Sequence, residues 1–203
     1  MMQRRDLLKM IMATTGVAMV GGNALAYELK SKVPLTDTVF KSDDLLLFNE
    51  IAEVILPRTN TPGAKDVNAG LMALIIANDC YTSRERDTLV KGLHSLNKNV
   101  EKSYGSPYLL LSSIEKTEFI NQLDAAAKDY NHQQNIYYLS NTPYDRESSD
   151  EKPLPHYFTL IKQLTLFSFF TSKEAATQVL RYEAVPGKYN GELDYKKGDR
   201  AWF

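Results

Sequence analysis

The sequence contains only one cysteine, Cys80. An intrachain disulfide needs two cysteines, covalently bound haem needs a Cys-x-x-Cys-His motif, and an iron–sulfur cluster generally needs several cysteines. The sequence therefore excludes all three in their usual forms, and stability must come from core packing. Because Cys80 follows the apolar run Leu71–Ala77, we expect it to be a buried small residue rather than a reactive thiol.

The motifs that most enzyme and cofactor sites need are missing as well. The sequence has no Gly-x-Gly-x-x-Gly motif, no Gly-x-x-x-x-Gly-Lys phosphate loop and no Gly-x-Ser-x-Gly elbow. His94, His132 and His156 are far apart, and none has a histidine or carboxylate three or four residues after it. The acidic runs Asp43-Asp44 and Glu147–Glu151 fit a helix N-terminus and a solvated loop. We therefore predict no catalytic, cofactor-binding or metal-binding residues in this chain.

Neither an excess of basic residues nor a long hydrophobic run is present. The chain has 24 Lys and Arg against 25 Asp and Glu, so no nucleic-acid-binding surface is indicated. The longest uncharged apolar stretch near the start, Met10–Val20, is far shorter than the roughly 20 residues that span a bilayer. No later segment reaches that length, and we expect no membrane-spanning helix in the rest of the chain.

What the chain does have is an export signal over residues 1–26. A basic region precedes the apolar stretch, and a small-x-small cleavage site follows it. The residues concerned are Arg4, Arg5, Leu7, Leu8 and Lys9 in a twin-arginine motif, and Ala24 and Ala26 at the cleavage site. The pattern predicts a twin-arginine signal peptide, the twin-arginine translocase as a partner, and the periplasm as the destination. Cleavage would leave 21 basic and 24 acidic residues; an uncleaved signal that acts as an anchor is the alternative.

Six later segments have the apolar periodicity or the capping residues of α-helices. They run from Ser42 or Asp43 to Leu56, from Asp66 through Ile76, from Thr82 to Tyr104, from Ser112 to Tyr130, from Pro153 to Phe170, and from Ser172 to Arg181. No segment is rich in strand-forming residues. We therefore expect an all-α fold: a single helical domain of about six helices over residues 42–203, with an extended arm over 27–41 before it and an irregular tail at its end. The second helix is expected near the centre, and residues 131–151 in a surface loop.

A proline-rich loop between the first two predicted helices is the first candidate binding segment. Two prolines fix φ, and Pro62-Gly63 suits the centre of a type II turn. One interpretation is an interhelix connector whose Arg58 pairs with a carboxylate, and the sequence favours it. The other is a rigid surface that presents Arg58, Thr59 and Asn60 to a partner at low entropic cost. The candidate partner-binding residues are Pro57, Arg58, Thr59, Thr61, Pro62 and Gly63.

The tail after the last predicted helix is the second candidate. It is rich in aromatic and turn-forming residues without helical periodicity, a composition common at protein interfaces. Its candidate partner-binding residues are Tyr182, Pro186, Gly187 and Tyr189, and Tyr195 and Trp202 follow them. Packing of this segment against its own domain is an equally good interpretation.

Three parts of the chain together resemble the gluconate 2-dehydrogenase subunit 3 family, the small subunit of membrane-bound gluconate 2-dehydrogenase. They are the leader, the segment Ile55–Ala64 (ILPRTNTPGA), and the block Phe158–Gly191, which contains FTLIKQLTLFSFFTSKEA and YEAVPGKYNG. The likeness covers most of the chain after the leader. Asn60 stands where the family often has an acidic residue, so no charged contact is expected there.

The resemblance implies a non-catalytic subunit of a complex that oxidises CH–OH groups of sugars, sugar acids or glycosides. FAD is expected in a large subunit of the glucose-methanol-choline type, with a c-type cytochrome as a further candidate partner and no cofactor in this chain. Because twin-arginine export carries folded proteins, the small subunit would escort and stabilise the flavoprotein. It would reside in the periplasm, peripheral to the inner membrane through its complex. The alternatives are a stand-alone periplasmic binding or stress protein and, third, an enzyme in its own right.

Overall fold

The computed structural model describes residues 35–136, 153–185, 187–188 and 190–203. It divides the chain into two units, residues 1–37 and residues 38–203. In the first unit only the short 3-10 helix η2, Leu35–Asp37, is described. The predicted export residues Arg4, Arg5, Leu7, Leu8 and Lys9 and the cleavage residues Ala24 and Ala26 lie outside the described residues.

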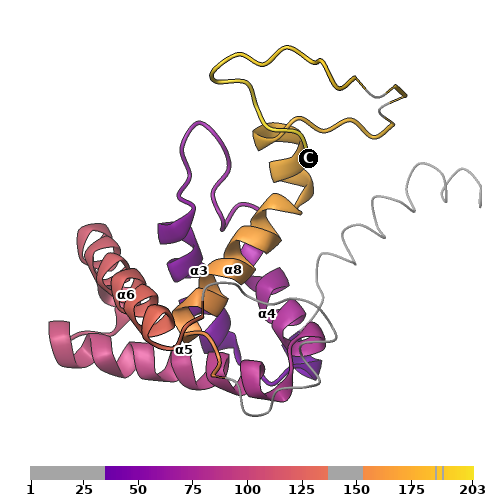
Figure 1. The fold of residues 1–203 in the computed structure, drawn as a ribbon. Helices are drawn as coiled ribbons and strands as arrows, with labels where there is room; N and C mark the ends of the chain where they lie inside the picture. Colours follow the sequence, from indigo (N-terminus) through magenta and orange to yellow (C-terminus); the bar gives the residue numbers. More distant parts are fainter. Residues whose placement is uncertain (1–34, 137–152, 186, 189) are drawn as a thin grey trace, which may run out of the picture. The chain divides into compact units, whose positions relative to one another are not determined.

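The second unit is built from helices (Figure 1). They are α3 (Ser42–Ile55), α4 (Ala69–Cys80), α5 (Ser83–Tyr104), η3 (Tyr108–Leu110), α6 (Ser113–Gln133), α8 (Tyr157–Phe170) and the π-helical turn η4 (Ala175–Val179). The described part of the chain contains no strand, only an isolated bridge between Arg181 and Trp202. The all-α prediction is therefore confirmed. None of the described helices is long and apolar enough to span a bilayer.

The two predicted capping boxes start α5 and α6 as expected. The Thr82 hydroxyl accepts a hydrogen bond from the backbone of Glu85, whose carboxylate accepts one from the backbone of Thr82 at 2.9 Å. Ser112 and Glu115 make the same exchange at the start of α6. These reciprocal bonds satisfy amides that a helix leaves unpaired in its first turn. At the far end of α5, Gly105 adopts φ 69°, the left-handed conformation that suits glycine as a helix stop.

Several predicted helix boundaries are wrong, and side chains near them serve other contacts. α4 begins at Ala69, after Asn68 in a left-handed conformation, and not at Asp66, whose carboxylate accepts a hydrogen bond from Gly63. α8 begins at Tyr157 rather than Pro153, because the His156 ring caps the helix by accepting from the Phe158 amide at 3.2 Å.

Another wrong boundary is at the end of α6, which continues to Gln133 and so includes the first residues of the predicted loop. Within that last turn, the Asn131 amide group accepts from the His156 amide and donates to the Thr159 hydroxyl. These two bonds hold the end of α6 against the start of α8. The predicted helix from Ser172 to Arg181 is also shorter, a single turn over Ala175–Val179.

The centre of the fold is α8, and α4, which the sequence analysis expected near the centre, packs directly against it. α8 contacts α3, α4, α5 and α6, which surround it (Figure 1). Its buried residues are Phe158, Leu160, Ile161, Leu164, Thr165, Ser168 and Phe169. Burial of these large side chains supplies a major part of the hydrophobic stabilisation. Every other long helix therefore depends on α8 for part of its apolar cover.

α4 is buried on a face of small residues. Ala69, Gly70, Ala73, Leu74 and Ala77 are buried, whereas Met72 remains 49% exposed. A Cβ on Gly70 would come within 2.2 Å of the Asn49 side-chain oxygen, so the glycine allows α3 and α4 to approach closely. High apolar content thus predicted that α4 packs in the core, but not which face does so.

Cys80 is exposed, contrary to the prediction that it is buried. It is the last residue of α4, and the following residue, Tyr81, is extended. The buried face of α4 has its final member at Ala77. An apolar run therefore indicates that a helix is buried without showing whether its last turn still lies over the core.

The helical unit starts before the first long helix. Phe40, at the end of the predicted arm, is 3% exposed, and the Val39 amide donates to the Asn78 side chain at 3.2 Å. Residues 38–41 thus pack with the helices and join the second unit, which begins at Thr38.

A glycine sets the contact between α5 and α8. A Cβ on Gly92 would lie 2.3–2.5 Å from three atoms of the Tyr157 side chain, including Cβ and Cγ. Those atoms belong to the rigid base of the ring and cannot turn away. Tyr157 is half-buried in this contact, and that burial raises the pKa of its hydroxyl to about 12.

Two carboxylates connect helices through pairs of lysines. Glu50 of α3 pairs with Lys116 of α6, at 2.8 Å, and with Lys65. Asp124 of α6 pairs with Lys162 of α8, at 2.8 Å, and with Lys128. Burial alone would raise the pKa of each carboxyl, but the lysine hydrogen bonds and charges lower both below their ordinary values.

Gly92→Ala should destabilise the fold by about 1–3 kcal/mol, because the new methyl group overpacks the contact with Tyr157. Alanine is the better helix former by about 1 kcal/mol, so any loss cannot come from helix propensity. Urea denaturation followed by circular dichroism measures the effect. Lys91→Ala, at the exposed neighbouring position, is the control. Equal or greater stability of Gly92→Ala would contradict the close approach.

The free energy of unfolding should fall as the pH drops below about 4.5, the ordinary pKa of Glu50. A carboxyl whose pKa is lowered by folding stabilises the protein above its unfolded pKa and loses that contribution as it is protonated. Glu50→Gln should cost about 1 kcal/mol or less at neutral pH and reduce the loss in acid. Urea titrations between pH 7 and pH 3 test this, with exposed Glu101→Gln as control. An unchanged acid slope in Glu50→Gln would refute the assignment.

Candidate functional site

The loop from Pro57 to Asp66 is closed by a carboxylate of the helix before it. Glu53, in the last turn of α3, accepts hydrogen bonds from the backbone amides of Arg58, at 3.0 Å, and Lys65, at 2.9 Å. The Ala64 amide donates to the Leu56 carbonyl at 2.9 Å. One side chain thus holds both ends of the loop, and the loop conformation is fixed without a hydrophobic core of its own.

A second carboxylate holds the loop from the other side. Asp66 accepts from the Gly63 amide at 2.8 Å and pairs with the Arg58 guanidinium at 2.9 Å. The predicted pairing of Arg58 with a neighbouring carboxylate is therefore confirmed. The Arg58 side chain is nevertheless 71% exposed, so the ion pair orients a guanidinium that faces solvent.

Gly63 is required for space and not for an unusual backbone angle. The predicted type II turn needs a positive φ at Gly63, but the positive-φ residues of the described chain do not include it. A Cβ at this position would lie 2.6 Å from the Arg58 backbone nitrogen and 2.6 Å from a Glu53 carboxylate oxygen. The glycine lets the Glu53 carboxylate reach into the loop, a contact that sequence spacing cannot reveal.

The loop presents its polar tip to solvent. Pro57, Arg58, Thr59, Asn60 and Thr61 are exposed, Pro62 is half-buried and Gly63 is buried. Thr59 and Thr61 bind each other, through their hydroxyls at 3.2 Å and from the Thr59 amide to the Thr61 carbonyl at 3.0 Å. A surface already ordered in the free protein loses little entropy on binding. The geometry suits recognition of another molecule through Arg58 and the threonines.

The tail returns to the helix from which it leaves. The Arg181 amide donates to the Ala201 carbonyl at 2.7 Å, and the Phe203 amide donates to the Arg181 carbonyl at 3.2 Å. Of the predicted tail residues, Tyr182 and Gly187 are exposed, and Gly187 has φ 60°. Pro186 and Tyr189 lie outside the described residues. The sequence analysis missed the contribution of Arg181, because nothing in an irregular segment signals a contact between residues so far apart.

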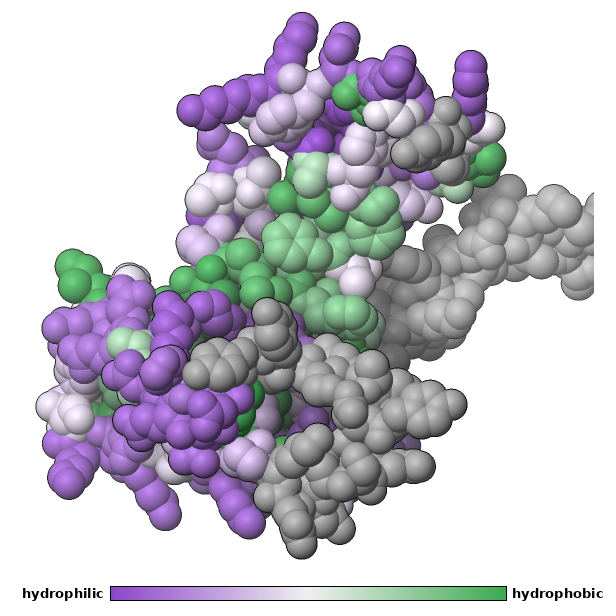
Figure 2. Space-filling view, viewed as in Figure 1, coloured by the Kyte–Doolittle hydropathy of each residue, from purple (hydrophilic) through white to green (hydrophobic). Residues whose placement is uncertain are grey.

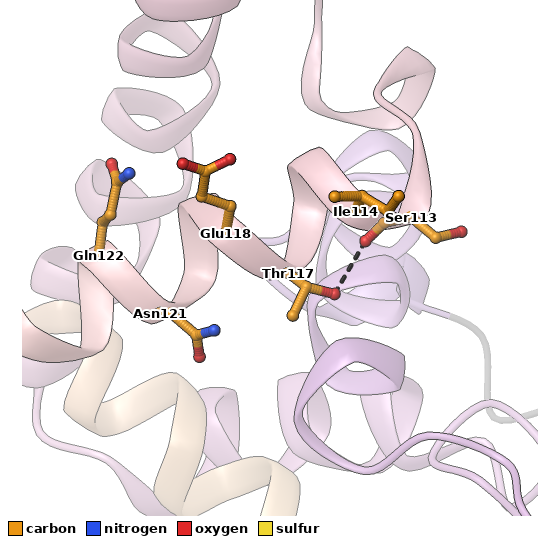
Figure 3. A pocket seen from close by; sticks show the side chains of 6 residues that line it. All are labelled: Ser113, Ile114, Thr117, Glu118, Asn121 and Gln122. Atoms are coloured by element: carbon orange, nitrogen blue, oxygen red, sulfur yellow. Dashed lines mark hydrogen bonds between the residues drawn. The ribbon is translucent and has the colours of Figure 1, made fainter.

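A shallow depression of about 560 Å³ lies along one face of α6. Its lining comes from that helix: Ser113, Ile114, Thr117, Glu118, Asn121 and Gln122 (Figure 3). The Thr117 hydroxyl donates to the Ser113 carbonyl at 2.8 Å, and Glu118 is the only ionisable residue of the lining. The depression thus offers a contact surface, with no second titratable group of its own for acid–base work.

The histidines take structural positions where their surroundings are described. His94 on α5 lies 3.3 Å from the buried Asp44 carboxylate on α3, and His156 caps α8. Burial lowers the pKa of His156, which favours the neutral ring that accepts the Phe158 amide. Within the described ranges, no group of three or more His, Cys, Asp or Glu side chains is placed to hold a metal ion.

Glu53→Ala should unfold the loop tip and lower stability by about 1–2 kcal/mol, because two backbone amides lose their acceptor. Glu53→Gln keeps a single side-chain acceptor oxygen and should show a smaller loss. Amide hydrogen exchange at Arg58 and Lys65 reports the loop directly, and urea denaturation reports the stability. Exposed Glu101→Ala on α5 is the control. Unchanged exchange at both amides in Glu53→Ala would contradict this account.

The sequence of this chain matches a known protein family. Residues 42–187 match the family described as Gluconate 2-dehydrogenase subunit 3. The matched range contains all the described long helices, the Pro57–Asp66 loop and the start of the tail. Comparisons with curated proteins and with solved structures find no match. The match covers well over half of the chain, which therefore belongs to the gluconate 2-dehydrogenase subunit 3 family and is a subunit of a dehydrogenase complex.

Proposed function

We propose that this chain is the non-catalytic small subunit of a periplasmic FAD-dependent dehydrogenase complex. It escorts the folded flavoprotein subunit through twin-arginine export and stabilises it. The family match over residues 42–187 carries the proposal, because it makes the chain a subunit of a dehydrogenase complex. The twin-arginine sequence at Arg4 and Arg5 supports the export role.

In this proposal the chemistry belongs to the large subunit. FAD, bound in a protein of the glucose-methanol-choline type, accepts electrons from a CH–OH group of a sugar, sugar acid or glycoside. A c-type cytochrome subunit is the candidate acceptor, and the complex is peripheral to the inner membrane. This chain contributes binding surface only, in keeping with an exposed tip on the Pro57–Asp66 loop that is ordered by Glu53 and Asp66.

The proposed contacts with the flavoprotein involve the exposed residues of two segments. The first is the loop tip, with Pro57, Arg58, Thr59 and Thr61 exposed at its surface and the half-buried Pro62 and the buried Gly63 as support beneath them. The second is the tail, which begins with the exposed Tyr182. Pro186, Gly187 and Tyr189 belong to the same proposed contact set.

The apolar surface of α8 supports the proposal of a protein partner. Phe167 is 55% exposed although it lies on the central helix. Figure 2 shows a band of apolar side chains over α8, between hydrophilic surfaces on either side. Contiguous apolar surface of this kind marks contact sites in soluble proteins. A flavoprotein subunit that packs against this band would bury its own apolar surface there and would be stabilised. When this chain is absent, that surface of the flavoprotein would lose its cover.

Replacing Arg4 and Arg5 with lysine should leave the flavoprotein's dehydrogenase activity in the cytoplasm, because the pair supplies the export address for both subunits. Cell fractionation, with activity and flavin absorbance measured in each fraction, gives the result. Lys9→Arg keeps the arginine pair and the local charge and serves as the control. Full periplasmic activity in the double lysine variant would refute the escort role, and purification of this chain as a colourless monomer would favour a stand-alone binding protein.

A further inference from the structure

The last segment of the chain is held where it leaves and rejoins η4, and yet it buries almost no surface. All twenty described residues from Tyr182 to Phe203 are exposed. The Arg200 guanidinium nevertheless donates to three carbonyls at the end of η4, those of Thr177, Gln178 and Leu180, at 3.0–3.5 Å. These bonds satisfy carbonyls that a helix leaves unpaired at its C-terminal end. The tail is therefore a closed loop with a fixed base.

The base of this loop carries an aromatic cluster. The Arg181 guanidinium lies over the Trp202 ring, 4.9 Å from its centre, and the Tyr182 and Phe203 rings meet edge to face at 5.8 Å. We name Arg181, Tyr182, Arg200, Trp202 and Phe203 the C-terminal clasp. Its three aromatic rings remain half or more exposed: Tyr182 by 50%, Trp202 by 53% and Phe203 by 59%.

This composition is that of an energetic anchor for another protein. Residues that dominate binding energies are enriched in Trp, Tyr and Arg. Backbone pairing between residue 181 and residues 201 and 203 holds the three rings in place before binding. A ring that is already oriented costs less entropy to bury than one on a free chain end. The clasp is thus organised for contact, and its three aromatic residues leave half or more of their surface to solvent.

The size and position of the segment suit a protein partner, and the family match, which makes this chain a subunit of a complex, favours a different subunit as the occupant. A stable interface of standard size uses about 20–30 residues on each side, and the exposed segment offers twenty described residues. It follows η4, which packs on α8, so it adjoins the apolar band of that helix (Figure 2). Residues 188–203 lie beyond the family match, whereas Arg181 and Tyr182 lie within it.

We infer that the C-terminal clasp is the anchor by which this chain binds its flavoprotein subunit, with Trp202 and Phe203 entering an apolar pocket of that partner. The inference rests on the proposed function and names the surface through which this chain would bind its partner. Trp202 is the only tryptophan of the chain, so a single probe reports on the anchor. The full chain is labelled with 5-fluorotryptophan, and its ¹⁹F resonance is recorded alone and with the unlabelled flavoprotein subunit.

The labelled Trp202 should be accessible to a soluble paramagnetic quencher in the isolated chain and protected in the complex. The double variant Trp202→Ala with Phe203→Ala should bind the flavoprotein about 30-fold or more weakly, the scale of a hot-spot truncation. Leu110→Ala removes a large apolar side chain that is equally exposed, by 76%, but lies on η3 and outside the tail, and should bind nearly as well as the unmodified chain. Circular dichroism of each variant checks that the helices remain folded.

Different results would overturn the clasp as the anchor and the subunit function. If the flavoprotein binds the chain but leaves Trp202 accessible, or binds the double variant at full affinity, the clasp is not the anchor and the subunit function stands. If Trp202 is already protected in the isolated monomer, the chain covers its own clasp. If it is protected in a dimer of this chain, a second copy does so. Both results overturn the inference, and failure of the unmodified chain to bind any flavoprotein overturns the function as well.

Discussion

The fold depends on the burial of one helix, α8, by the helices around it. Its close approach to α5 is possible because Gly92 leaves room for the Tyr157 ring. Asn131 and Asp124 of α6 bind its first turns through His156, Thr159 and Lys162. A helix that is apolar on nearly every side is stable in water only when other elements cover it. At Phe167, which is 55% exposed, α8 retains apolar surface that the neighbouring helices do not cover.

The two surfaces assigned to binding are ordered by polar contacts instead of by burial. Glu53 and Asp66 fix the loop through backbone amides and Arg58, and Arg200 fixes the tail through backbone carbonyls. Charge-assisted hydrogen bonds to backbone groups are stronger than neutral ones, so a few of them can order a segment that has no core. Both surfaces therefore exist before a partner arrives, which reduces the entropic cost of association.

The sequence could predict most of the helices but not their arrangement. Local signals were sufficient for α5 and α6, because a capping box places all its partners within four residues. The central position of α8, the exposure of Cys80 and the space requirement at Gly63 depend on contacts between segments far apart in the chain, which no local pattern encodes. The loop and Tyr182 were identified from composition as candidate surfaces. The Arg181–Trp202 contact was missed, because it joins two points of an irregular segment.

On the proposed function, the rigidity of these surfaces has a kinetic consequence for export. A flavoprotein that must leave the cell folded has to meet its escort in the cytoplasm, before either subunit is translocated. If binding required the escort to fold first, association would be slowed by that conformational step. The loop hydrogen bonds and the base of the clasp form within this chain alone, so each encounter presents ordered side chains. Arg58 and Trp202 can then bind in the orientation that they already have, and the complex forms before the export signal is used.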